Sequence, residues 1–137
     1  RYRGYCEAQR SAGITNVEAR QADAFITEKS GHDALNELIR RGVKFDAIFA
    51  ASDMIAIGAM RALAEHGLDV PNDIAIVGFD DLPAASLTSP PLTTIQQDFK
   101  RAGEMLVDAL IRQIRNEDAD TAALPAKLIV RKSCGAH

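Results

Sequence analysis

Apolar positions along the chain recur at two spacings, one typical of helices and the other of strands. Spacings of three and four residues predict helices over 1–12, 27–41, 53–66 and 98–115. Shorter apolar runs predict strands over 17–21, 45–51, 74–78, 93–95 and 127–133. Because helices of ten or more residues separate most of the strands, parallel pairing is possible. We therefore predict an α/β fold with an open, mostly parallel sheet flanked by helices.

Residues that commonly cap helices stand where these helices begin. Thr27 and Asp98 each precede a helical pattern, and the pair Ser52-Asp53 precedes a third. Of that pair, we expect Asp53 to cap the helix rather than to bind a ligand. The strands at 45–51 and 74–78 are almost wholly apolar, which predicts a sheet covered on both faces.

Polar residues follow three of the predicted strands. They are Ser52-Asp53, Asp80-Asp81 and the segment 96–98. In an open α/β sheet, ligands bind beyond the carboxyl ends of the strands. Carboxylate, hydroxyl and amide groups together suit a ligand rich in hydroxyls. For Asp80-Asp81, a solvated turn is the alternative.

Composition and charge exclude several classes of function. Lys and Arg total 16 against 19 for Asp and Glu, a net charge of −3, which argues against an autonomous binder of nucleic acid or anionic membrane. Apolar runs fall short of the roughly 18 residues of a membrane span. We find no metal-ligand spacing, phosphate loop or nucleophile with a base, and so expect neither an enzyme nor a cofactor. Cys6 and Cys134 are typical of free thiols in a cytoplasmic protein.

The predicted helix 53–66 is apolar on more than one face, whereas a surface helix requires only one apolar stripe. Its apolar residues are Met54, Ile55, Ala56, Ile57, Ala59, Met60 and Leu63. We favour contact with another subunit as the reason, and a deep position in the chain's own core is the alternative.

Four segments in order carry a resemblance to a known family. Segments 49–60, 70–81, 90–97 and 128–133 read FAASDMIAIGAM, VPNDIAIVGFDD, PPLTTIQQ and LIVRKS. This set resembles the effector-binding core of the LacI/GalR family of bacterial transcription regulators, which is itself similar to periplasmic sugar-binding proteins. The resemblance covers the C-terminal part of the family pattern, and we expect the chain to be part of a longer protein.

The resemblance implies which residues contact the effector. Arg1 stands in the family's Arg-x-x-Gly-aromatic pattern, and Asp80 matches the aspartate that binds sugar hydroxyls. Ile26 falls where many members place an aromatic residue that stacks on a sugar ring. Ser52 matches a ligand-contacting position that is often Asn, and Gln97 matches a polar position at the inter-subdomain crossover.

The resemblance also implies a layout and a dimer. Residues 1–92 with 126–137 form the C-terminal subdomain, 93–97 form the crossover, and 98–125 pack on an N-terminal subdomain. Ile57 and the loop around Thr88 match dimer-interface positions, and Met54 lies on the same apolar helix.

The implied function is binding of a sugar or similar small polar effector, and dimerisation, in a cytoplasmic regulator that contacts operator DNA through an N-terminal helix-turn-helix. The alternative is a periplasmic solute-binding protein of a sugar transporter.

Overall fold

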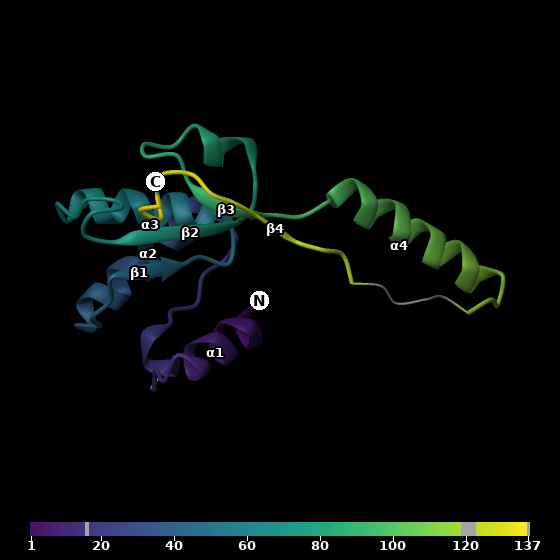
Figure 1. Cartoon of the computed structure of the whole chain (residues 1–137), viewed down its shortest axis with the longest axis horizontal. Coiled ribbons are helices and arrows are strands. Elements are labelled where there is room, and N and C mark those ends of the chain that lie inside the picture. Colours follow the sequence, from purple (N-terminus) through teal and green to yellow (C-terminus); the bar gives the residue numbers. More distant parts are fainter. Residues whose placement is uncertain (16, 119–122, 137) are drawn as a thin grey trace.

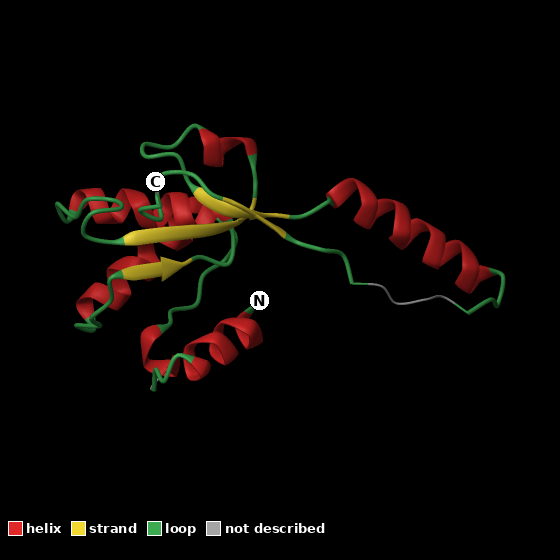
Figure 2. Ribbon diagram, viewed as in Figure 1, coloured by secondary structure: helices red, strands yellow, loops and turns green. Residues whose placement is uncertain are grey.

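The computed structural model describes residues 1–15, 17–118 and 123–136, and it is an α/β fold, as predicted (Figures 1 and 2). The helices are α1 (Tyr2–Ser11), α2 (Glu28–Arg40), α3 (Asp53–Glu65) and α4 (Phe99–Ile114). The strands are β1 (Ala47–Phe49), β2 (Ala75–Asp80), β3 (Thr93–Gln96) and β4 (Lys127–Ile129). Two short 3-10 helices are η1 (Val17–Arg20) and η2 (Pro83–Ser86).

The sheet has the strand order β1-β2-β3-β4. Strands β1, β2 and β3 are parallel, and β4 runs antiparallel to β3. The prediction of a mostly parallel sheet is therefore confirmed. The parallel order places the carboxyl ends of β2 and β3 side by side, with Asp80 opposite Gln96.

The predicted strand at 17–21 is wrong, because Val17–Arg20 form the 3-10 helix η1. Only Val17 of this helix is buried. The carbonyl groups of Ala19 and Gln21 accept hydrogen bonds from the Arg41 guanidinium, at 2.7 and 2.9 Å. A side chain thus satisfies backbone groups that would otherwise require a neighbouring strand.

Helices α2, α3 and α4 begin where the sequence predicts, but at α3 the capping residue is Ser52 rather than Asp53. Thr27 Oγ1 accepts from Ser30 N at 3.2 Å, and Asp98 Oδ1 accepts from Arg101 N at 2.8 Å. At α3 the expectation that Asp53 is the cap is wrong, because Ser52 is the N-cap and its hydroxyl lies 3.5 Å from Ile55 N. Asp53 is the first helical residue and points into the protein.

The core lies between the sheet and the pair α2 and α3. Helix α3 packs against both α2 and β2. Core side chains come from both helices, from β2 and from the loops; they are Leu35, Ala50, Ala56, Ala59, Met60, Ala62, Leu63, Val70, Ile74, Ile76, Ala85 and Leu92. The deep position of α3 thus accounts for much of its apolar excess. Two glycines let the helices approach closely: a Cβ on Gly31 would lie 2.2 Å from Ile55 O, and one on Gly58 would lie 1.9 Å from Glu28 O.

Two strands differ from the predicted ones. β1 has three residues and is not covered on both faces, since Phe49 is 40% exposed. The Tyr5 ring stacks on the Phe49 ring, with 6.1 Å between the ring centroids. β4 ends at Ile129 rather than at 133. Beyond it, Arg131 N donates to the Thr93 hydroxyl at 2.8 Å, and Lys132 N and Ser133 N donate to the single carbonyl of Pro91, so the regular strand pairing ends.

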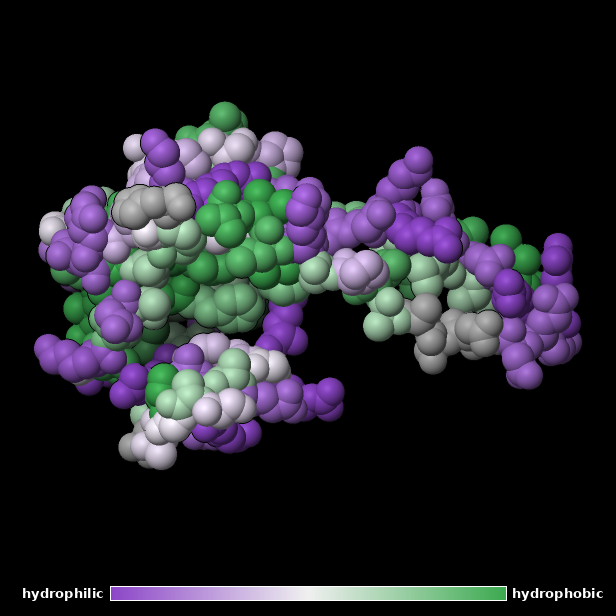
Figure 3. Space-filling model, in the orientation of Figure 1, coloured by the Kyte–Doolittle hydropathy of each residue, from purple (hydrophilic) through white to green (hydrophobic). Residues whose placement is uncertain are grey.

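Helix α4 projects away from the sheet and has no buried residue among those described (Figure 1). Its apolar residues recur at helical spacing and are exposed; the largest are Phe99, Leu106, Val107, Leu110, Ile111 and Ile114 (Figure 3). We call these six the α4 stripe. No helix in the described part of the chain is long and apolar enough to cross a membrane.

We expect stability to depend on pH through the contact between α2 and α3 at His32. Its Nε2 lies 2.7 Å from Glu65 Oε2, and hydrogen bonds with Glu65 and then Asp33 raise the pKa of His32 above the unfolded value of 6.5. The stabilisation is therefore complete below pH 6.5 and is lost as the pH rises through the higher folded pKa. Melting temperatures followed from about pH 6 to 9 should fall for the wild type. The fall should be smaller for His32→Gln, and identical profiles would contradict this.

Candidate functional site

Three segments that are distant in the sequence meet at the carboxyl end of the sheet. The Arg1 guanidinium contacts Asp80 Oδ1 through Nη2 at 3.0 Å, and Gln97 Nε2 donates to the same oxygen at 2.8 Å. Asp80 ends β2, Gln97 follows β3, and Arg1 precedes α1. Among the described residues, the second oxygen, Oδ2, receives no hydrogen bond. The structure thus brings together three of the five predicted effector contacts.

Arg1 is held by two further contacts. Its Nη1 donates to Ala51 O at 2.7 Å, and its guanidinium lies over the Phe79 ring, 4.0 Å from the centroid. Phe79 in turn packs edge-on against Phe49, at 6.5 Å between centroids. A guanidinium on an aromatic face is favourable by its charge and its planar shape. Phe79 is therefore part of the site, and its position directly before Asp80 was the signal available in the sequence.

Asp81 faces a different set of residues from Asp80. Asp81 Oδ1 accepts from Arg131 Nη2 at 2.6 Å, and Oδ2 accepts from Gln96 Nε2 at 2.8 Å. Side chains of both members of the ion pair are mostly buried. Asp80 and Asp81 are therefore not a solvated turn: one carboxylate faces Arg1, and the other ties the loop to the end of the chain.

Two predicted contacts lie apart from this cluster. Ser52 is fully buried and its hydroxyl is directed to the start of α3. Ile26 lies in the loop before α2 and is 66% exposed, and its neighbour Phe25 is 83% exposed. We define the Asp80 cluster as Arg1, Phe79, Asp80 and Gln97.

Asp53 is a fully buried carboxylate beneath this cluster. Its Oδ2 accepts from Leu82 N at 2.7 Å and its Oδ1 from the Thr94 hydroxyl at 2.5 Å. Burial raises the pKa of Asp53 above its ordinary value, and the hydrogen bonds from Thr94 and Leu82 oppose this rise. Sequence reasoning missed this role because it treated Asp53 as a helix cap.

The residues predicted for a dimer interface are half-buried in the single chain. Met54 and Ile57 lie on α3. The Thr88 hydroxyl donates within its own loop, to Pro90 O at 2.8 Å, and Leu87 beside it is 83% exposed. The structure of one chain leaves the interface as a prediction.

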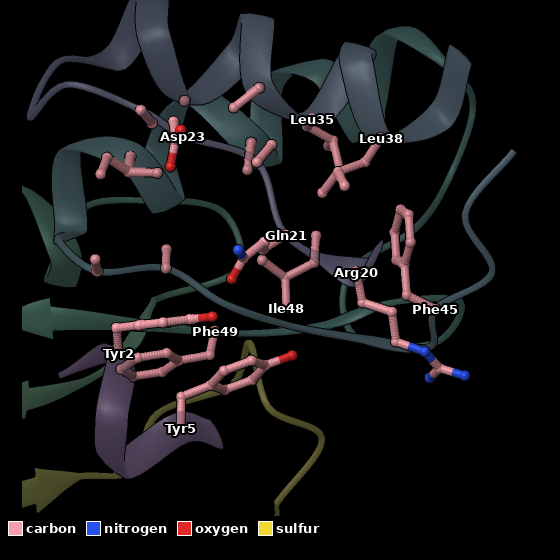
Figure 4. Close-up of a pocket in the computed structure, with 18 of the residues that line it drawn as sticks. Tyr2, Tyr5, Arg20, Gln21, Asp23, Leu35, Leu38, Phe45, Ile48 and Phe49 are labelled. Atoms are coloured by element: carbon pink, nitrogen blue, oxygen red, sulfur yellow. The ribbon is translucent and has the colours of Figure 1, made fainter. Parts of the chain in front are cut away.

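A cavity lined mostly by apolar side chains lies beneath Tyr2, Tyr5 and Phe49 and reaches Arg1 of the Asp80 cluster (Figure 4). It has a volume of about 330 Å³ and lies between α1, α2, β1 and the segment 20–24. Its walls are mostly apolar and include Tyr5, Leu38 and Phe49; of the Asp80 cluster, Arg1 lines it, whereas Phe79, Asp80 and Gln97 do not. The cavity lies along β1, the strand at one edge of the sheet, and we assign no ligand to it. The described residues contain no group of three or more His, Cys, Asp or Glu that could hold a metal ion.

Comparisons with known proteins agree with this fold. Residues 1–134 match the family described as periplasmic binding protein-like domain. The chain is 33% identical over 135 residues to the HTH-type transcriptional repressor PurR of Pasteurella multocida, covering 97% of this chain and 40% of that protein. It is 36% identical over 114 residues to the ribose operon repressor of Escherichia coli, covering 83% of this chain and 34% of the relative.

Solved structures give the same result. A transcriptional regulator CelR–cellobiose complex superposes with a TM-score of 0.87 at 36% identity, covering 95% of this chain and 40% of the other. The lac repressor dimer bound to operator and an anti-inducer superposes with a TM-score of 0.89 at 33% identity, covering 99% of this chain and 41% of the other.

The fold is that of a periplasmic binding protein-like domain. The chain belongs to this family, as an effector-binding core of the LacI/GalR regulators. It spans about 40% of the length of the curated repressors that it matches.

Proposed function

We propose that the chain is the effector-binding and dimerising part of a LacI-type transcription regulator, and that its effector is a sugar or a similar small polar molecule. The observation that carries the proposal is the convergence of Arg1 and Gln97 on one oxygen of Asp80. The relatives named above are repressors, and one structural neighbour holds cellobiose, which favours this function over transport.

The chemistry of the Asp80 cluster suits a hydroxyl-bearing ring. The Oδ2 atom of Asp80 can accept from a ligand hydroxyl, because both protein donors reach Oδ1. The Arg1 guanidinium has five N–H donors, and two of them, one on Nη1 and one on Nη2, are used in the contacts with Ala51 and Asp80. The others can donate to a ligand oxygen. Gln97 adds a carbonyl acceptor. The Phe79 ring supports the Arg1 guanidinium from below and so fixes the position of its free donors. This is an arrangement for binding rather than for catalysis.

The layout expected from the sequence belongs to the same proposal. Residues 1–92 with 126–137 form one subdomain, 93–97 the crossover, and 98–125 pack on a second subdomain supplied by the rest of the protein; residues 16, 119–122 and 137 of these ranges lie outside the described part of the chain. The exposed α4 stripe supports this, because exposed apolar surface of this kind marks an interaction site. Effector binding between the subdomains favours the closed form, and closure changes the spacing of two DNA-binding heads in the cytoplasm.

The experiment is calorimetric titration of the full-length protein that carries this chain with ribose, glucose and cellobiose. We expect saturable binding of at least one of the three sugars. Small-angle scattering should show a more compact molecule when that sugar is bound. If none of them binds, or if binding leaves the shape unchanged, the proposed function is contradicted.

We expect the full-length protein to dimerise through α3, with Met54, Ile57 and the loop around Thr88 in a two-fold interface. Ile57 is half-buried in the single chain, so a partner would complete its burial. Ile57→Asp would place an unpaired charge there and should give monomers in sedimentation velocity. Lys100→Asp, on exposed α4, is the control and should remain dimeric. A wild-type protein that sediments as a monomer would contradict the prediction.

A further inference from the structure

The buried carboxylate of Asp53 lies against a pair of adjacent strands. Gly78 on β2 and Thr94 on β3 are direct partners in the sheet. A Cβ on Gly78 would lie 2.3 Å from Asp53 Oδ1, so only glycine leaves room for the carboxylate at this point. The Thr94 hydroxyl donates to the same oxygen at 2.5 Å. Asp53 thus links the start of α3 to the centre of the sheet.

From this position Asp53 is hydrogen-bonded, directly or through Thr94, to the two backbone N–H groups that follow Asp80. Leu82 N donates directly to Asp53 Oδ2 at 2.7 Å. Asp81 N lies 3.3 Å from Thr94 Oγ1, whose own hydrogen is given to Asp53 Oδ1. The Asp53 carboxylate therefore accepts a hydrogen bond directly from Leu82 N–H, and it holds the Thr94 hydroxyl that accepts from Asp81 N–H.

The backbone that these bonds hold is strained. Asp80 has φ 109° and Asp81 has φ 53°, values that residues other than glycine adopt at a cost. Such conformations persist where the surrounding structure fixes them, and they occur often at functional sites. The left-handed turn directs the Asp80 side chain to Arg1 and Gln97 and the Asp81 side chain to Arg131.

We propose that Asp53 and Thr94 are positioning residues for effector binding: they hold the left-handed turn at 80–82 and thereby place the Asp80 carboxylate. The inference rests on the proposed function of Asp80 as an effector contact. Neither residue touches the effector, because both are buried below the turn. Their effect on affinity therefore passes through Asp80.

The first test requires no ligand. In the full-length protein, Thr94→Val removes the hydroxyl and Thr94→Ser retains it. We expect amide hydrogen exchange at Asp81 to become at least about tenfold faster in Thr94→Val and to return towards the wild-type rate in Thr94→Ser. Equal exchange rates in the two variants would overturn the proposal. If Thr94→Val does not fold, Asp53→Asn replaces it, because the amide keeps the shape and one acceptor. Failure of both variants to fold would assign the pair a structural role only.

The second test uses whichever of ribose, glucose and cellobiose binds the wild-type protein most tightly. Thr94→Val should raise its Kd by about fivefold, and Thr94→Ser by less than about twofold. Combined with Asp80→Ala, Thr94→Val should have no further effect on Kd, because the group that it positions is gone. An equal loss in the presence and absence of the Asp80 carboxylate would overturn positioning. If Asp80→Ala itself leaves Kd unchanged, the proposed function fails instead.

Discussion

Gly58→Ala should lower the free energy of unfolding by about 3 kcal/mol, because the added methyl group has no space between α2 and α3. Its carbon would lie 1.9 Å from Glu28 O and 2.7 Å from His32 N, and both atoms belong to the backbone of α2. Backbone atoms of a helix can move aside only if the whole helix moves, which would disturb the core around Leu35 and Leu63. Urea unfolding followed by circular dichroism measures the change.

Gly103→Ala is the matched control. Gly103 lies inside α4, and a Cβ there would meet nothing within 4 Å. Both substitutions reduce the entropy of the unfolded chain and improve helix propensity, so the control should gain about 0.5–1 kcal/mol. Gly31→Ala should resemble Gly58→Ala, because its carbon would lie 2.2 Å from Ile55 O. Stabilisation by all three substitutions would show that the two helices are not in such close contact.

The helices and the fold class could be predicted from the sequence because their signals are local. Thr27 and Asp98 mark helix starts within one residue of where the structure has them. The strands at 17–21 and 45–51 were less predictable, since pairing and coverage depend on distant partners. Arg41 satisfies the carbonyl groups near η1, and the Phe49 ring on β1 packs against Tyr5 of α1 and Phe79 of β2.

The convergence of Asp80 and Gln97 could also be predicted, because the carboxyl ends of parallel strands meet at one edge, whereas Arg1 was expected at the site only from the family resemblance. The roles of Asp53 and Asp81 could not. Ser52 and Asp53 are equally good caps in sequence, and what separates them is the space that Gly78 leaves for the longer side chain. Asp81 depends on Arg131, which is 50 positions away along the chain.

Asp80→Asn should weaken effector binding at least tenfold while the protein remains folded. The amide keeps the shape of the carboxylate, and its oxygen can still accept from Arg1 and Gln97. An NH₂ group then replaces Oδ2, the proposed acceptor for an effector hydroxyl. A hydrogen bond to a charged acceptor contributes about 1.5–3 kcal/mol, and each 1.4 kcal/mol is a factor of ten in Kd. Calorimetry with the sugar that binds the wild type measures the loss.

Asp81→Asn makes the same change of charge one residue further along and is the control that decides the origin of the effect. Both positions have positive φ, which Asn tolerates as well as Asp, so neither substitution adds backbone strain. Asp81 faces Arg131 and Gln96, so its replacement should lower the melting temperature and leave Kd for the sugar within about twofold. If the two variants weaken sugar binding equally, the loss comes from the net charge of the turn. If only Asp80→Asn weakens it, the carboxylate of Asp80 is the effector contact.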